Sequence, residues 1–162
     1  MNPYKKIFSE LQKSGVKYLV VGGVAVNLYG YSRLTGDIDI LLMLNPVNLL
    51  KMERIMKHLG YVERLPVKLY ELRNKNRVKK WLKEKGMTAY TFISSKKPQL
   101  DIDILAGHSL DFNKYYKKRT VIEAWGIRLP VIAFNDLMIM KKKAGREKDL
   151  LDLKALLELK SL

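Results

Sequence analysis

Two stretches of strict alternation constrain the fold of this chain more than any other feature. They are Gly36-Asp37-Ile38-Asp39-Ile40-Leu41 and Leu100-Asp101-Ile102-Asp103-Ile104-Leu105. Side chains at i and i+2 lie on one face of a β-strand, so each stretch predicts a strand with buried isoleucines and aspartates on the opposite face. Carboxylates sharing a face repel one another, and strands are depleted in Asp. A hard divalent cation with oxygen ligands resolves both difficulties, which favours a metal site over a solvated sheet face.

The two predicted strands together offer more carboxylates than one metal ion needs. If they are neighbours in a sheet, three or four carboxylates meet, and that number suits two Mg²⁺ ions bridging a triphosphate and an attacking oxygen. Asp37 and Asp39 share one face, as do Asp101 and Asp103. The alternation leaves open whether Asp101 or Asp103 reaches the metal.

A glycine pair precedes the first of these strands. Apolar, β-favouring residues over 17–21 predict a strand, Gly22-Gly23 predicts a turn, and residues 24–29 predict a helix. Exposed N–H groups at a helix start favour anions, and glycine lets a phosphate approach the backbone closely. The alternative is a tight turn that binds nothing.

A cationic segment lies near the end of the chain, at Lys141-Lys142-Lys143-Ala144-Gly145-Arg146-Glu147-Lys148-Asp149. Helical periodicity on both sides of Gly145 predicts a loop between two helices. Such a loop could hold phosphate charge near the metals. The alternative is a solvated basic loop.

The remaining pattern predicts a mixture of helices and strands without strict alternation, hence an α+β fold with a sheet covered by helices. Length fits a single domain over 1–162. We predict helices over 3–12, 47–59, 73–85, 109–117, 135–143 and 147–159. We predict further strands over 61–64, 87–93, 99–105, 120–125 and 128–132, of which the last four form two hairpins.

Composition bounds the partners. The net charge of +15 attracts phosphates of nucleic acid or nucleotides, although Lys-rich surfaces also occur in proteins from hot environments. The absence of cysteine excludes disulfides, cysteine-ligated zinc and thiol catalysis. No apolar run is long enough for a signal peptide or a membrane span, so we expect a cytoplasmic protein without membrane contact.

Taken together, these motifs resemble the nucleotidyltransferases of the DNA polymerase beta superfamily. The chain is most similar to a small bacterial and archaeal subfamily related to the toxin nucleotidyltransferases of toxin–antitoxin systems. The resemblance runs from about residue 15 to 157 and is carried by GGVAVNLYGYSRLTGDIDIL, DIDIL, GIRLPVI and KKKAGREKDLLD. It implies the nucleotidyltransferase fold, a mixed β-sheet flanked by helices.

The resemblance also implies roles for the acidic residues and glycines. Asp37 and Asp39 would ligate Mg²⁺. Asp103 matches the third carboxylate of the family better than Asp101, and would complete the metal site and help to deprotonate the acceptor. Gly22 and Gly23 would cradle the triphosphate.

Basic residues are implied as further nucleotide contacts. Arg33, just before the metal strand, could touch a phosphate. Lys141, Arg146 and Lys148 match the basic residues of the family's closing motif. We expect the acids of that motif, Asp149 and Asp152, to pair with these bases or to cap the last helix.

The implied activity is Mg²⁺-dependent transfer of NMP from an NTP to an acceptor hydroxyl on RNA, a protein or a small molecule, with release of pyrophosphate. Partners would be the nucleoside triphosphate and either RNA or a toxin or antitoxin protein. The first alternative is a non-catalytic nucleotide- or RNA-binding module, such as an antitoxin, that retains the fold. The second is a basic interaction protein. Clustered carboxylates argue against a pure binder, which does not need them.

Overall fold

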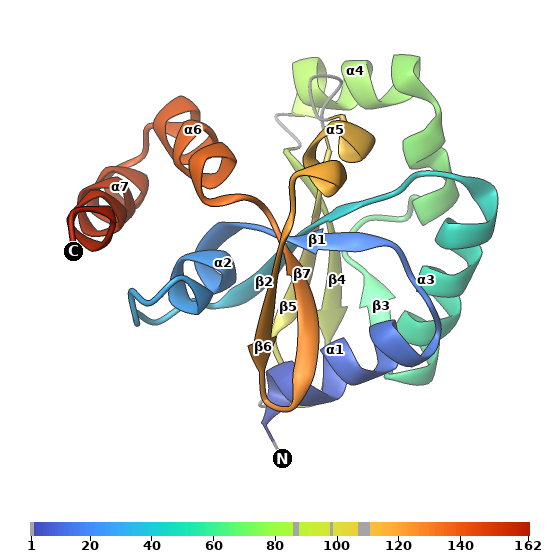
Figure 1. Ribbon diagram of the computed structural model, residues 1–162. Coiled ribbons are helices and arrows are strands. Elements are labelled where there is room, and N and C mark those ends of the chain that lie inside the picture. The colour runs from blue at the N-terminus through green and yellow to red at the C-terminus, as the bar shows by residue number, and fades with distance from the viewer. Residues whose placement is uncertain (1, 86–87, 98, 107–110) are drawn as a thin grey trace.

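The computed structural model describes residues 2–85, 88–97, 99–106 and 111–162. Its centre is a seven-stranded sheet with the order β3-β4-β5-β2-β1-β7-β6 (Figure 1). The strands are β1 Tyr18–Val20, β2 Asp37–Leu42, β3 Tyr61–Glu63, β4 Ala89–Ser94, β5 Asp101–Leu105, β6 Thr120–Ala124 and β7 Ile127–Val131. The helices are α1 Pro3–Lys13, α2 Gly22–Leu28, α3 Pro46–His58, the 3-10 helix η1 Leu69–Arg73, α4 Lys75–Lys85, α5 Phe112–Lys117, α6 Phe134–Ala144 and α7 Glu147–Lys160.

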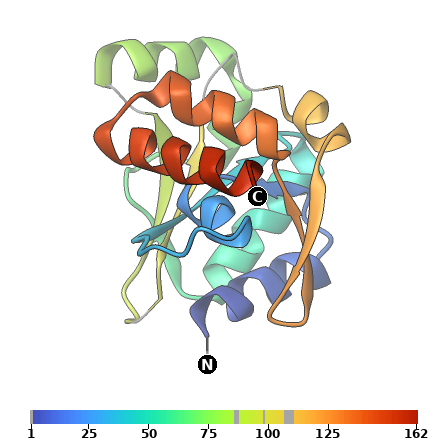
Figure 2. The ribbon, with the colours of Figure 1, turned by 60° about the vertical axis from the view of Figure 1, so that its left-hand side comes forward.

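Helices cover both faces of this sheet. In Figure 1, α1 and α3 lie on one side of the strands, and α2, α6 and α7 lie on the other. Figure 2 shows α6 and α7 running side by side in front of α2. Strand pairs β2–β5 and β1–β7 are parallel and the others antiparallel. The predicted α+β class and mixed sheet are confirmed.

The alternation in β2 and β5 sorts apolar and acidic side chains onto opposite faces. The fully buried isoleucines of the two strands are Ile38, Ile40, Ile102 and Ile104. Burial of each stabilises the fold by about 1.5–3 kcal/mol. The aspartates on the other face are only half-buried. Because β2 and β5 pair in parallel, Asp37 lies opposite Asp101 and Asp39 lies opposite Asp103.

Both predicted hairpins form. Strands β4 and β5 pair antiparallel, as do β6 and β7. Trp125 (φ 55°) and Gly126 (φ 75°) connect β6 to β7 as a two-residue turn with both residues left-handed, the primed geometry that matches strand twist. Residues 87 and 98, which we assigned to the first hairpin, and 109–110, which we assigned to a helix, lie outside the described residues.

Two predicted boundaries are wrong. We predicted a helix over 73–85, but α4 begins at Lys75 after the separate helix η1. The side chain of Asn74 accepts hydrogen bonds from the N–H groups of Asn76 and Arg77, and this capping restarts the chain as a new helix. The turn predicted at Gly22-Gly23 is instead the first part of α2, entered through Gly22 at φ +62°.

Within the described ranges, no helix combines the length and apolar character needed to cross a bilayer.

Candidate active site

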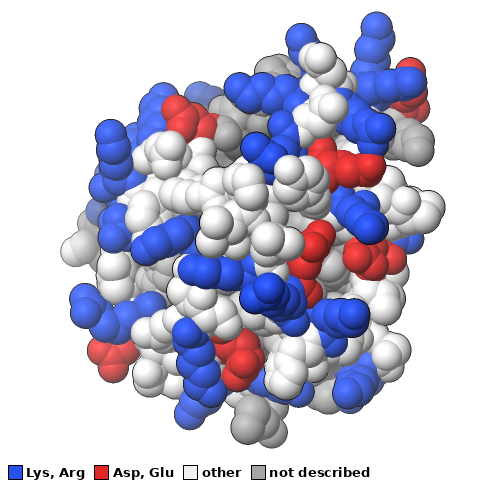
Figure 3. Space-filling view, turned by 90° about the vertical axis from the view of Figure 1, so that its right-hand side faces the viewer, with Lys and Arg blue, Asp and Glu red and all other residues white. Residues whose placement is uncertain are grey.

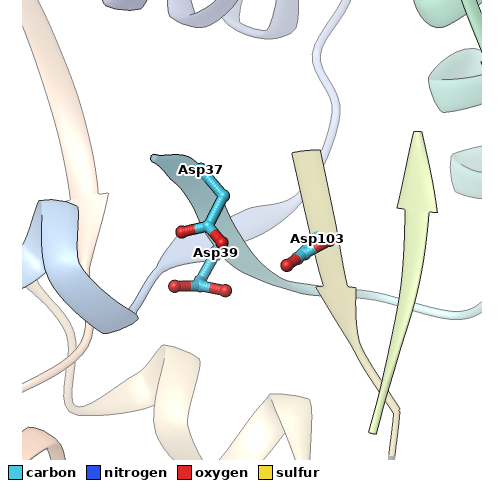
Figure 4. A group of neighbouring side chains, drawn as sticks. All are labelled: Asp37, Asp39 and Asp103. Atoms are coloured by element: carbon cyan, nitrogen blue, oxygen red, sulfur yellow. The ribbon is translucent and has the colours of Figure 1, made fainter. Parts of the chain in front are cut away.

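Three carboxylates meet on the face of the sheet that α2, α6 and α7 cover. Asp37 and Asp39 extend from β2 and Asp103 from β5, and one oxygen of each lies within 4.8 Å of the others (Figure 4). Asp101, two residues earlier on β5, is not in this group. Its carboxylate instead accepts a hydrogen bond from Arg64 at 3.2 Å. The positions of the side chains therefore distinguish two aspartates that alternation alone could not, since Asp103 joins the acidic group and Asp101 pairs with Arg64.

The three carboxylates carry more negative charge than their surroundings neutralise. Burial, together with the charges of Asp37 and Asp103, raises the pKa of Asp39 to about 6, although Lys141 and Lys148 partly offset this. Burial also raises the pKa of Asp103, despite the hydrogen bond that Thr91 donates to it at 2.5 Å. Closely spaced carboxylate oxygens whose pKa values are raised by burial and by neighbouring negative charge are suited to bind a hard divalent cation.

The glycine pair at the start of α2, Gly22-Gly23, packs directly against this acidic group. A Cβ atom at Gly22 would lie 2.1 Å from Oδ2 of Asp39, and the positive φ of Gly22 also disfavours any other residue. The N–H of Val21 donates to the carbonyl of Asp39 at 3.0 Å. A backbone hydrogen bond thus joins the start of α2 to β2, and the lack of a side chain at Gly22 lets the two segments approach closely.

A pocket of about 440 Å³ opens beside the acidic group. Asp37 and Asp39 line it, whereas Asp103 does not and joins the site through its carboxylate alone. The remaining residues predicted to bind the nucleotide all line this pocket: Gly22, Gly23, Arg33, Lys141, Arg146 and Lys148. Segments far apart in the sequence therefore converge on one cavity.

Two of these bases are held by buried acids. Nε and Nη2 of Arg33 donate to Asp152 at 2.6 and 2.8 Å. Nζ of Lys141 lies 3.0 Å from Asp149 and 2.9 Å from Asp152. Both aspartate side chains are fully buried. The charged groups of Arg33 and Lys141 therefore form ion pairs with acids of α7, although both residues line the pocket.

The other two bases are more accessible. Arg146 donates to Asp149 at 2.7 Å while its side chain stays 62% exposed. Lys148 is exposed, and among the described residues it forms no ion pair. The backbone N–H of Arg146 also donates to Asp149, which caps α7. The expected pairing of Asp149 and Asp152 with basic residues is confirmed, and of the two only Asp149 also caps α7.

Charge balance explains why the buried acids stay ionised. Burial alone would raise the pKa of Asp149 and Asp152, but hydrogen bonds outweigh it and lower both. Those bonds come from Arg146 and Lys141 to Asp149, and from Arg33 and Lys141 to Asp152. Three cations face two anions, so this network leaves net positive charge beside the pocket.

Sequence reasoning missed Thr91. It lies on β4 opposite Asp103 in the antiparallel register and donates its hydroxyl to that carboxylate. The predicted hairpin implies that Asp103 has a partner on the neighbouring strand, since cross-strand residues on one face contact each other. Only the exact register of the two strands identifies that partner as Thr91.

The arrangement of elements matches solved nucleotidyltransferases over nearly the whole chain. The lincosamide antibiotic adenylyltransferase LnuA, solved with lincomycin bound, has a TM-score of 0.67 at 15% identity, covering 97% of this chain and 96% of that one. ANT(2″)-Ia in complex with adenylyl-2″-tobramycin has a TM-score of 0.59 at 11% identity, covering 94% and 84%. An antigenic nucleotidyltransferase-like protein from Paracoccidioides brasiliensis has 0.58 at 14% identity, covering 96% and 73%. The chain has the nucleotidyltransferase fold.

The family follows from the sequence. Residues 8–162 match the family described as nucleotidyl transferase AbiEii toxin, type IV toxin–antitoxin system. Because this match spans nearly the entire chain, the protein belongs to that family, and its enzyme class is nucleotidyltransferase. No curated protein is significantly similar to it in sequence. The resemblance drawn from the motifs, including its toxin–antitoxin subfamily, is confirmed.

Proposed function

We propose that this protein transfers NMP from a nucleoside triphosphate to an acceptor hydroxyl and releases pyrophosphate, with Mg²⁺ as cofactor. The observation that carries the proposal is the meeting of Asp37, Asp39 and Asp103 beside a glycine-lined pocket. In-line transfer needs metal ligands and a phosphate cradle in contact with each other. The contact between Gly22 and Asp39 supports that requirement.

The carboxylates would hold the cofactor. Asp37 and Asp39 would be ligands of Mg²⁺, with Asp103 as a third, and two ions fit the number of oxygens. Bound there, Mg²⁺ would neutralise triphosphate charge and lower the pKa of an acceptor hydroxyl. Asp103, whose pKa is already raised by burial, is suited to accept the acceptor's proton.

The remaining residues of the pocket would bind and orient the triphosphate. The backbone at Gly22 and Gly23 can approach phosphate oxygens closely. Arg146 and Lys148 are accessible at the pocket and supply positive charge. Arg33 and Lys141 act through the acids they bind, so they hold α7 and the segment before β2 in place around the substrate.

The acceptor is proposed from charge. RNA is favoured because exposed bases outnumber acids on η1 and α4, where they are Arg73, Lys75, Arg77, Lys79, Lys80 and Lys83. Figure 3 shows Lys and Arg side chains spread over the face to which these elements contribute. A polyanion is drawn to such a surface. Hydroxyls on a partner protein or a small molecule are the other acceptors that the experiment below must include.

The two aspartates of β5 provide a matched test. Purified protein is incubated with each labelled NTP, Mg²⁺ and RNA, partner protein or aminoglycoside acceptors, and labelled acceptor is measured. We expect Asp103→Asn to reduce transfer by a factor of about a thousand or more, since it removes a proposed ligand of Mg²⁺ and the proposed acceptor of the hydroxyl proton. Asp101→Asn should stay within about threefold of the wild type, because Asp101 pairs with Arg64 outside the acidic group. Equal activity of wild type and Asp103→Asn would refute the proposed site.

A further inference from the structure

A threonine hydroxyl lies beside the glycine pair at the start of α2. The position that a Cβ atom would take at Gly23 is 2.6 Å from Oγ1 of Thr35 and 3.0 Å from its Cβ. Thr35 also lines the 440 Å³ pocket, next to Gly22 and Gly23. Thr35, in the segment before β2, therefore occupies the space that a side chain at Gly23 would need, and it places a hydroxyl there.

This hydroxyl is held in place but weakly bonded. Oγ1 of Thr35 lies 3.3 Å from the carbonyl oxygen and 3.5 Å from the carboxylate of Asp37. Both distances exceed the 2.7–2.8 Å typical of hydroxyl donors, and the single proton can serve only one acceptor at a time. Little is lost if the hydroxyl turns to a stronger acceptor in the pocket.

The segment that carries Thr35 is fixed by hydrogen bonds to two helices and by one within the segment. The side chain of Asn27, on α2, donates to the carbonyl of Arg33 at 2.9 Å and accepts from its N–H at 3.0 Å. Arg33 in turn donates to Asp152 on α7 and, through Nη1, to the carbonyl of Leu34 at 2.9 Å. A donor on a fixed backbone loses little entropy when it binds a ligand.

We propose that Thr35 is a nucleotide-binding residue whose hydroxyl donates to a phosphate oxygen of the NTP at the glycine pair that begins α2. The inference rests on the function proposed above and adds a side-chain donor to a helix start where the glycines offer only backbone N–H groups. Phosphate is the acceptor that fits, because its oxygens are charged and a hydrogen bond to a charged oxygen is stronger than the two long contacts it replaces.

Two substitutions separate the hydroxyl from the shape of the side chain. Thr35→Val keeps the shape and removes the donor, and it should raise the KM for NTP and the Kd of a non-hydrolysable NTP analogue about tenfold. Thr35→Ser keeps the donor and should remain within about twofold of the wild type. The KM for the acceptor and the thermal midpoint should be unchanged in both variants.

Thr120→Val is the matched control, because Thr120 is an exposed threonine on β6 and does not line the pocket. Equal KM and Kd values for Thr35→Val and Thr120→Val, in an active wild type, would overturn this inference alone. Equal losses in Thr35→Val and Thr35→Ser would overturn it too, since the hydroxyl would not be the cause. A wild type that neither transfers NMP nor binds the analogue would instead refute the proposed function.

Discussion

Asp39 is the residue on which the requirements of folding and of the site conflict most directly. Its backbone pairs with Val21 and its neighbours Ile38 and Ile40 are fully buried, so its place on the sheet is fixed. Its carboxylate is nevertheless pressed against Gly22 and two other carboxylates. Without a cation, the ionised form destabilises the folded protein. Clustered charge of this kind is more typical of a functional site than of a structural one.

The pKa of Asp39 predicts how stability depends on pH. The folded value of about 6 lies above the unfolded 3.8, so the folded state binds the proton more tightly and loses stability as pH rises through 6. Asp39→Asn removes this loss. We compare the free energy of unfolding of Asp39→Asn with that of the wild type in EDTA. The difference should favour the variant by about 1–2 kcal/mol more at pH 7.5 than at pH 4. Urea unfolding across that range measures the difference.

Metal provides the control for this experiment. Saturating Mg²⁺ with an NTP analogue should stabilise the wild type at pH 7.5 and have little effect on Asp39→Asn, because a ligand that binds only the folded state stabilises it. A stability difference between the two proteins that is constant from pH 4 to 7.5 would contradict the raised pKa.

At the level of elements, buried ion pairs connect the helices α6 and α7 to each other and to the segment before β2. Lys141 of α6 binds two acids of α7, and one of these, Asp152, also binds Arg33 from the segment before β2. Removing one partner of a buried ion pair leaves an uncompensated charge. The network therefore holds in place several residues that line the pocket, among them Arg33, Lys141 and Asp149.

Lys141→Met tests this connection. We expect it to lower the free energy of unfolding by about 3 kcal/mol, because Asp149 and Asp152 lose a shared cation in a buried environment. Lys142→Met is the matched control on the next, exposed position and should change stability by less than about 0.5 kcal/mol. Urea denaturation of both variants measures the two values. Equal stabilities would mean that Lys141 does not hold α6 against α7.

For the molecule as a whole, the dominant property is charge. With 31 basic and 16 acidic residues, the net charge is +15. The field of such a protein concentrates phosphates near its surface. The same field would act on the proposed NTP in the pocket and on a polynucleotide bound along η1 and α4, but the polynucleotide would release many more counterions.

Salt dependence follows from that difference. We expect the affinity for unfractionated transfer RNA, measured by fluorescence anisotropy, to fall at least about tenfold between 50 and 200 mM KCl. The affinity for an NTP analogue with Mg²⁺ should fall much less over the same range. RNA binding that is absent at 50 mM KCl, or unchanged at 200 mM, would argue for a protein or small-molecule acceptor.

Local sequence determined most of the elements of this protein, because their causes are local. Alternation determined which faces of β2 and β5 are apolar. Gly126 indicated the turn between β6 and β7, and helical periodicity predicted α7, the last helix, which has 14 residues. The motifs also identified the family, since their order along the chain is a property of sequence. The sequence did not predict the boundary between η1 and α4, because an Asn such as Asn74 can either continue a helix or cap the start of a new one.

Only the tertiary structure decided which charges meet. The meeting of Asp103 with Asp37 and Asp39 depends on the pairing of two strands whose partner residues lie 64 positions apart (37 and 101), and a shift of one residue would turn the aspartates of β5 to the other face. Arg33 and Lys141 bind buried acids, and this depends on where α7 docks. The hydroxyl of Thr35 lies beside Gly23 because hydrogen bonds between Asn27 and the backbone of Arg33 hold the segment before β2 against α2. Patterning acts over a few residues, whereas electrostatic contacts join whatever the fold brings together.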